Sequence, residues 1–83
     1  PLYDEYFSYL KSEWADMKNV GGRWGGVVTA ASFLKQFLPE KVSWAHLDIA
    51  GVAYNDKEHN GYPRGASGYG VVLTVAFLQQ LLK

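Results

Sequence analysis

A single strand-like run lies between two helices that are apolar on nearly every side, and this pattern limits what the chain can fold into. In residues 42–50 (VSWAHLDIA), alternation places Trp44, His46 and Asp48 on one face of an extended, buried segment. Apolar helices are expected over residues 26–38 and 69–82, the first of them largely buried. A lone strand leaves its backbone hydrogen-bonding groups unpaired. The sequence therefore predicts a piece of a larger α/β domain.

The rest of the chain completes the order helix–loop–helix–strand–loop–helix. Four glycines in residues 19–26 predict a loop, and residues 54–68, with three glycines, a proline and many polar residues, predict a long surface loop. An amphipathic helix is expected at the start, from apolar residues at helical spacing: Tyr3, Tyr6, Phe7, Leu10 and Trp14. This order of elements suits a piece of a larger α/β domain, one that is not autonomous.

Composition excludes several classes of protein. The 83 residues include no cysteine, which rules out a disulfide framework and a cysteine metal site. Eight basic and eight acidic residues cancel without a block of one sign, so we expect no nucleic-acid partner and no anionic membrane surface as a partner. No apolar run approaches the roughly 20 residues of a membrane span, and no signal peptide is visible. A cytoplasmic location is the resulting expectation.

His46 and Asp48 are the first candidates for chemistry, because a histidine and a carboxylate on one face can bind zinc or relay a proton. A metal site needs a third ligand, and the only other histidine is His59, in the long loop. The favoured interpretation is a locally hydrogen-bonded pair, since buried polar groups find partners. The residues alone therefore give no self-sufficient active site, and a metal or catalytic role for this pair stays the less favoured alternative.

Two other motifs permit a functional and a structural interpretation. The loop GGRWGG precedes a helix, where backbone amides and Arg23 could bind phosphate, but it matches no phosphate-loop pattern. Tight turning and close packing are the favoured explanation for its glycines. Ser67 in RGASG could pass for a nucleophile, yet no base is placed beside it. A role as a helix cap or turn residue is favoured.

Taken together, three strings resemble the C-terminal end of the leucine (cytosol) aminopeptidase family of dinuclear-metal exopeptidases. They are PLYDEYFSYLKSEWADMKNVGGRWGGVVTAASFLKQF, WAHLDIAGVAY and PRGASGYGVVLTVAFL, in the order and at the spacings typical of that family. The resemblance implies that residues 1–83 are the C-terminal portion of an aminopeptidase catalytic domain, and that their fold is the C-terminal part of a mixed β-sheet flanked by helices. It further implies a hexameric enzyme that removes N-terminal residues from peptides with two divalent ions, zinc or manganese. The family's metal ligands and catalytic arginine lie in motifs such as NTDAEGR, which this sequence lacks, so the resemblance implies no catalytic residue and no metal ligand in this chain.

The resemblance also assigns three residues to the substrate pockets. Val20 matches an apolar residue that lines the pocket for the residue after the scissile bond. Ala50 and Ala53 match positions in the pocket for the N-terminal side chain, where small residues leave room for a leucine-sized group. The sequence departs from its relatives at Val72, where an arginine is common, and at Trp14 and Trp24, which replace smaller residues.

The sequence leaves two other classes of protein open. A non-catalytic relative would use the same fold as a structural or interaction protein, and substituted metal ligands upstream would reveal it. An autonomous small binding domain is the third possibility, which a cooperative thermal transition of the isolated 83 residues would support. On the preferred interpretation, the segment is inactive alone, and its partners are the rest of the catalytic domain, peptide substrates and further copies of the enzyme.

Overall fold

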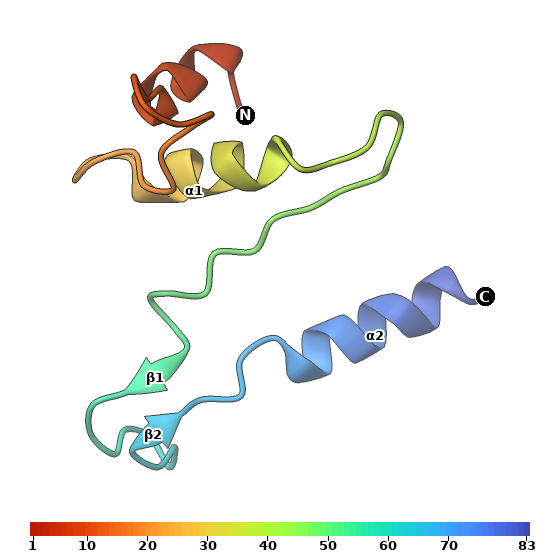
Figure 1. Cartoon of the computed structure of the whole chain (residues 1–83). Coiled ribbons are helices and arrows are strands. Elements are labelled where there is room, and N and C mark those ends of the chain that lie inside the picture. The colour runs from red at the N-terminus through yellow and green to blue at the C-terminus, as the bar shows by residue number, and fades with distance from the viewer. The chain divides into compact units, whose positions relative to one another are not determined.

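The computed structural model describes all 83 residues, which form two compact units, residues 1–46 and residues 47–83 (Figure 1). The first unit contains a 3₁₀-helix, η1 (Asp4–Leu10), and an α-helix, α1 (Gly26–Lys35). The second contains two short strands, β1 (Tyr54–Asn55) and β2 (Gly65–Ala66), followed by the helix α2 (Val71–Leu81). The fold is thus a small mixed α/β arrangement with a two-stranded antiparallel sheet.

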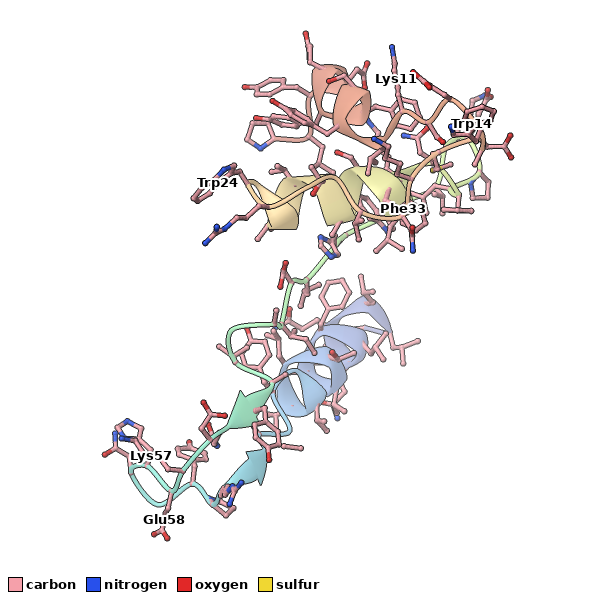
Figure 2. All side chains as sticks on the ribbon, turned by 60° about the vertical axis from the view of Figure 1, so that its left-hand side comes forward. Lys11, Trp14, Trp24, Phe33, Lys57 and Glu58 are labelled. Atoms are coloured by element: carbon pink, nitrogen blue, oxygen red, sulfur yellow. The ribbon has the colours of Figure 1, made fainter.

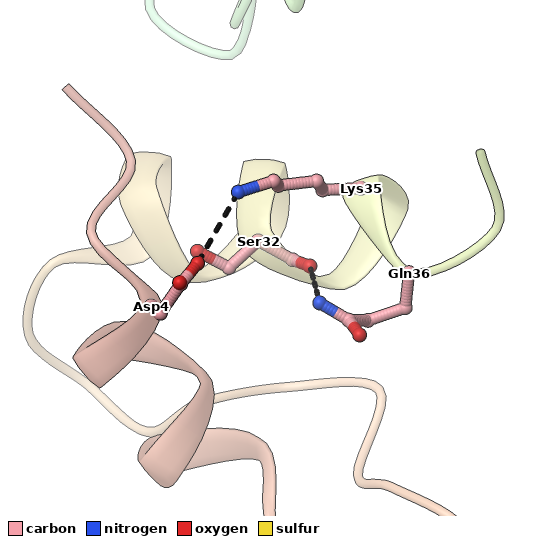
Figure 3. A network of polar contacts seen from close by, with 4 residues as sticks. All are labelled: Asp4, Ser32, Lys35 and Gln36. Atoms are coloured by element: carbon pink, nitrogen blue, oxygen red, sulfur yellow. Dashed lines mark hydrogen bonds and ion pairs between the residues drawn. The ribbon is translucent and has the colours of Figure 1, made fainter. Parts of the chain in front are cut away.

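Packing of η1 against α1 forms the core of the first unit. Leu10, at the end of η1, is fully buried, and Ala31 of α1 is nearly so. One ion pair joins the two helices at the surface, with the Lys35 ammonium nitrogen 3.4 Å from a carboxylate oxygen of Asp4 (Figure 3). Because Asp4 is almost wholly exposed, solvent screens this pair and the apolar contacts hold the helices together.

The first helix is shorter than its apolar spacing predicts. It ends at Leu10, and Lys11 is already extended, with φ −63° and ψ 139°. The backbone N–H groups of Trp14 and Ala15 both donate to the Ser12 hydroxyl, at 3.2 Å each. A serine side chain that binds nearby backbone amides competes with helical hydrogen bonds. The prediction that Trp14 lies on the buried face is therefore wrong, and its side chain is 94% exposed (Figure 2).

The glycine-rich loop before α1 is explained by close packing and tight turning, as predicted. A Cβ atom on Gly21 would lie 2.6 Å from a methyl carbon of Thr29, a buried residue of α1. Gly22 and Gly25 have φ values of 101° and 67°, which side-chain-bearing residues rarely adopt. The Thr29 hydroxyl also donates to the Gly25 carbonyl oxygen at 3.2 Å. The lack of a side chain at Gly21 lets the loop lie directly on α1. Gly25 is the residue immediately before the first residue of α1.

The predicted strand over residues 42–50 does not form. This segment makes no strand hydrogen bonds and is mostly exposed rather than buried. The first unit contains no other strand that could pair with this segment. A strand without a partner leaves its backbone hydrogen-bonding groups unpaired, as noted from the sequence, and this explains why none forms. The predicted alternation is nevertheless visible, because the rings of Trp44 and His46 stack on the same side, with centroids 6.2 Å apart.

The predicted loop over residues 54–68 contains a hairpin. Tyr54 pairs with Ala66 and Asn55 with Gly65, in antiparallel register. Beyond these strands, His59 and Tyr62 form an isolated antiparallel bridge, and the residues between them, Asn60 and Gly61, both have positive φ. An Asn-Gly pair is the strongest short-range signal for such a two-residue hairpin turn. The loop prediction missed this signal.

Both α-helices occur where they were predicted, but their burial differs from the expectation. In α1 only Thr29, Ala31 and Ser32 are buried, so this helix is not largely buried as predicted. No residue of α2 is buried, although nearly all of its side chains are apolar. Helices apolar on every side are stable only when covered. None of the helices has both the length and the hydropathy needed to cross a membrane.

Candidate functional site

The candidate site is the turn that connects the extended segment to the hairpin of the second unit. The backbone N–H groups of Val52 and Ala53 both donate to the carbonyl oxygen of Ile49, at 3.0 and 2.9 Å. The N–H of Ala50 donates to a carboxylate oxygen of Asp48 at 3.0 Å. Ala50 and Ala53, two of the residues assigned by resemblance, are thereby held at opposite ends of one hydrogen-bonded turn.

Ser67 forms hydrogen bonds that connect this turn to the segment that leads into α2. Its backbone N–H donates to the Ala53 carbonyl oxygen at 2.9 Å, and its hydroxyl donates to the carbonyl oxygen of Val52. The same hydroxyl oxygen accepts a hydrogen bond from the N–H of Tyr69 at 3.1 Å. Ser67 is therefore a turn residue, as favoured from the sequence, although it is not the cap of α2, which begins after Gly70.

An open hollow of about 530 Å³ lies on the second unit beside this junction. Its walls are mainly apolar and aromatic, which suits an apolar side chain from another molecule or segment. Neither Ala50 nor Ala53 lines it. The lining residues come from the turn, the hairpin and the first turn of α2, and include Val52, Asn55, Tyr62, Ser67, Tyr69 and Leu73.

The three residues that the resemblance assigns to substrate pockets do not all belong to one unit. Ala50 is exposed and Ala53 is half-buried, both in the second unit. Val20 belongs to the first unit, where it is 70% exposed in the loop between η1 and α1. Within their own unit, Ala50 and Ala53 are brought together by the turn, which the strand interpretation did not foresee.

The side chains of His46 and Asp48 each have a local partner. The His46 ring is parallel to that of Trp44 within 6°, and Asp48 accepts the hydrogen bond from Ala50. A buried, internally hydrogen-bonded pair was expected, whereas Asp48 is exposed and bonds to the backbone and not to His46. No group of three His, Cys, Asp or Glu side chains is close enough to hold a metal ion.

Arg23, the other candidate, is held by its neighbour in sequence. The central carbon of its guanidinium group lies 5.3 Å from the centre of the Trp24 ring, within the range of a cation–π contact. Trp24 itself is 82% exposed, and its side chain extends from the loop into solvent (Figure 2). This geometry directs Arg23 along an aromatic face and gives no support to the phosphate-binding alternative.

Comparison with known families identifies the chain. Residues 1–75 match the cytosol aminopeptidase family, catalytic domain. The chain belongs to the cytosol aminopeptidase family. This agrees with the resemblance of its three sequence strings.

Individual relatives in this aminopeptidase family cover nearly the whole chain. A probable cytosol aminopeptidase of Syntrophobacter fumaroxidans is 56% identical over 80 residues, 95% of the chain and 16% of the relative. That of Oleidesulfovibrio alaskensis is 61% identical over 71 residues, 86% of the chain and 14% of the relative. That of Chlamydia abortus is 48% identical over 83 residues, 99% of the chain and 17% of the relative. The chain thus spans about a sixth of the length of these curated relatives.

Sequence reasoning missed one feature of the aminopeptidase segment that the structure supplies. Ser67 connects to both Val52 and Ala53, fifteen and fourteen positions earlier in the chain. The residue pattern ASG signals only a turn, because no local periodicity reports such a distant partner. Gly65 and Gly68, on either side of Ala66 and Ser67, have positive φ and indicate the sharp turning that brings the serine into place.

Proposed function

We propose that this chain is the C-terminal portion of the catalytic domain of a leucyl aminopeptidase, which releases N-terminal amino acids from peptides. The observation that carries the proposal is the match of residues 1–75 to the family's catalytic domain. Support comes from relatives described as probable cytosol aminopeptidases, two of them more than half identical to this chain over the regions compared. The family name also favours a cytoplasmic enzyme.

In this proposal the segment forms part of the walls of the substrate pockets. Val20 contributes to the pocket for the residue after the scissile bond, and Ala50 and Ala53 to the pocket for the N-terminal side chain. Support comes from the turn that holds the two alanines, whose small side chains leave space. Burying a leucine side chain in such a space is worth about 1.5–3 kcal/mol. Selection by a pocket of this kind is modest, at about 1–3 kcal/mol per methylene.

The two divalent ions of the proposed enzyme, zinc or manganese, would be held by residues outside this chain. The side chains present do not fit a metal pair, since no three His, Cys, Asp or Glu residues converge. No step of the hydrolysis is therefore assigned to residues of this segment. Its contribution is to bind and orient the substrate through apolar surface, and the isolated segment is expected to be inactive.

The proposed partners are the rest of the catalytic domain and five further copies of the enzyme in a homo-hexamer. The uncovered apolar surface supports the first of these: Leu10 and Ala31 are the only buried apolar residues, and α2 buries none. So small a core does not offset the conformational entropy of folding 83 residues. We therefore infer that the segment completes the domain and does not fold alone.

The test of the proposed activity uses the complete protein that contains this segment. Purified with zinc or manganese, it should hydrolyse the amide bond of leucyl-p-nitroanilide, and removal of the metal by a chelator should abolish this activity. A matched protein that ends before Pro1 of this segment should be inactive. A metal-loaded complete protein without aminopeptidase activity would instead support the alternative, a non-catalytic structural or interaction protein of the same fold.

A separate measurement tests the lack of autonomy. The isolated 83 residues should melt without a cooperative transition when followed by circular dichroism, because most of their large apolar side chains are exposed. A sharp, reversible transition would support the autonomous small domain instead.

A further inference from the structure

The tip of the hairpin between β1 and β2 carries an asparagine followed directly by a glycine, in a two-residue turn. The N–H of His59 donates to the Tyr62 carbonyl oxygen at 3.0 Å, and the N–H of Tyr62 donates to the His59 carbonyl oxygen at 2.9 Å. Asn60 and Gly61 connect these residues with φ values of 49° and 81°. Both are exposed, shortly after Lys57 and Glu58 in the chain, which Figure 2 shows at the outer end of the hairpin.

The backbone nitrogen of Gly61 is free to react. Its N–H group makes no hydrogen bond within the chain, unlike those of His59 and Tyr62. Gly61 also has no side chain, and the space that a Cβ would occupy is open, with nothing within 4 Å. The side-chain carbonyl carbon of Asn60 can therefore approach this nitrogen without crowding. Proximity of a nucleophile to its target within one molecule raises the reaction rate strongly.

The His59 ring lies against the group that would leave. Its Nε2 atom is 2.9 Å from the side-chain amide nitrogen of Asn60, so the amide donates a hydrogen bond to the ring when this nitrogen is unprotonated. A histidine within hydrogen-bond distance of a departing nitrogen can deliver a proton to it. Nucleophile, electrophile and proton carrier are thus consecutive residues at one exposed turn.

We propose that Asn60 is a modification site that deamidates by reaction with the backbone of Gly61. The Gly61 nitrogen forms a bond to the side-chain carbonyl carbon of Asn60, and the bond from that carbon to the amide nitrogen breaks. Gly61 gives its N–H proton to solvent water, and the departing nitrogen takes one from the protonated form of His59, which solvent then restores, so that the protons balance and ammonia leaves. Water then opens the resulting succinimide at either of its carbonyl carbons, which gives an aspartyl or an isoaspartyl residue.

The products alter both the charge and the geometry of the hairpin. Each adds a carboxylate beside Asp56 and Glu58, in a loop whose basic residues are Lys57 and Arg64. The isoaspartyl form also lengthens the main chain by one carbon inside a turn of only two residues. The paired hydrogen bonds between His59 and Tyr62 fit the shorter turn, so this product should open the tip of the hairpin.

The other two asparagines serve as internal controls. Asn19 precedes Val20, whose branched side chain crowds the attacking nitrogen. Asn55 lies in β1, and its side-chain amide donates to the Pro63 carbonyl oxygen at 3.2 Å. Neither has a glycine after it or a histidine beside it, so the structure ranks Asn60 well ahead of both.

The experiment is peptide mapping by mass spectrometry after the complete protein that contains this segment has been kept at neutral pH and physiological temperature. The peptide containing Asn60 should convert to paired aspartyl and isoaspartyl forms roughly tenfold faster, or more, than those containing Asn19 or Asn55. Conversion of Asn60 at the same rate as the controls, or more slowly, would overturn the proposal.

Two variants test the roles assigned to Asn60 and His59 in this reaction. Asn60→Gln keeps the amide but places its carbonyl carbon one methylene farther from Gly61, and it should block conversion at this position. His59→Phe keeps a planar ring without the nitrogen, and it should slow conversion of Asn60 several-fold while leaving Asn19 and Asn55 unchanged. A rate unaffected by His59→Phe would refute the proton transfer, and equal conversion in Asn60→Gln would refute the succinimide route.

Discussion

The backbone N–H of Ser67 donates a hydrogen bond to the carbonyl oxygen of Ala53, at 2.9 Å, and thereby joins the approach to α2 to the turn that carries two proposed pocket residues. The serine hydroxyl adds a second connection, to Val52, and accepts the N–H of Tyr69. One residue thus satisfies backbone groups on both sides of the junction. The position of Ala53 depends on an interaction between residues fourteen apart in the chain.

Removal of the Ser67 hydroxyl should disturb the proposed pocket for the N-terminal side chain, although this hydroxyl is not itself proposed to contact the substrate. In the complete enzyme, Ser67→Ala leaves the Val52 carbonyl oxygen and the Tyr69 N–H without their partner, at a cost of about 0.5–1.5 kcal/mol for each hydrogen bond. KM for leucyl substrates should rise several-fold while kcat changes little, as measured by steady-state kinetics. Ser67→Thr keeps the hydroxyl and is the matched control. A Ser67→Ala enzyme with unaltered KM would exclude this positioning role.

The glycine loop provides a sharper test of packing. Gly21→Ala places a methyl group 2.6 Å from the Thr29 side chain, which is buried between the loop and α1. Overpacking of this kind typically costs about 1–3 kcal/mol. The apparent melting temperature of the complete enzyme should fall. Gly26→Ala is the matched control, since its Cβ meets nothing within 4 Å and its φ is not in the left-handed range. Equal melting temperatures for the two variants would contradict the close contact.

The sequence predicts those parts of the structure that depend on interactions between neighbouring residues, and it fails where other contacts decide the structure. The two α-helices were predictable because their apolar composition and glycine boundaries are local signals. The early end of η1 was not, since the apolar spacing continues to Trp14 while the Ser12 hydroxyl captures two backbone amides. The hairpin was predictable from Asn60 and Gly61 but was overlooked within a polar stretch.

In the candidate site, too, the type of each residue can be read from the sequence, but its position relative to other residues cannot. That Ala50 and Ala53 are small can be read directly, but the predicted strand ends at Ala50 and gives no position for Ala53, whose N–H donates to the Ile49 carbonyl oxygen and closes the turn. Residues 42–50 have the alternation of a strand and no partner to pair with. A β-pattern specifies which side chains share a face, as the stacked rings of Trp44 and His46 show, but a ladder requires a second strand.

The ion pair between Asp4 and Lys35 should contribute little to stability, although it joins the two helices of the first unit (Figure 3). Its two atoms are 3.4 Å apart, and the aspartate is almost fully exposed. Exposed pairs are worth about 0.2–1 kcal/mol in double-mutant cycles. A cycle of Asp4→Asn and Lys35→Met in the complete enzyme should give a coupling energy within this range that decreases with added salt. A larger coupling energy would mean that the pair is desolvated in the enzyme.

His46 should be dispensable for metal binding. Its ring stacks on Trp44, and no further ligand-type side chains converge with it on a metal site. In the complete enzyme, His46→Gln should therefore leave the metal content unchanged when measured by elemental analysis. Loss of the stacking contact should lower the melting temperature slightly, because stacked aromatic pairs contribute about 0.5–1.5 kcal/mol. Depletion of metal in this variant would show that His46 belongs to the metal site.

Ala53 offers the most direct test of the pocket assignment. It is half-buried, at the end of the turn that Ser67 fastens. In the complete enzyme, Ala53→Phe fills the space proposed for the N-terminal side chain and should raise KM for leucyl substrates roughly tenfold or more, a loss of about 1.4 kcal/mol. Alanyl substrates should suffer less, since a methyl group needs less room. Ala66→Phe introduces the same side chain at an exposed position of β2 and should leave both KM values unchanged. If Ala53→Phe alters neither the leucyl nor the alanyl KM, Ala53 does not line the pocket.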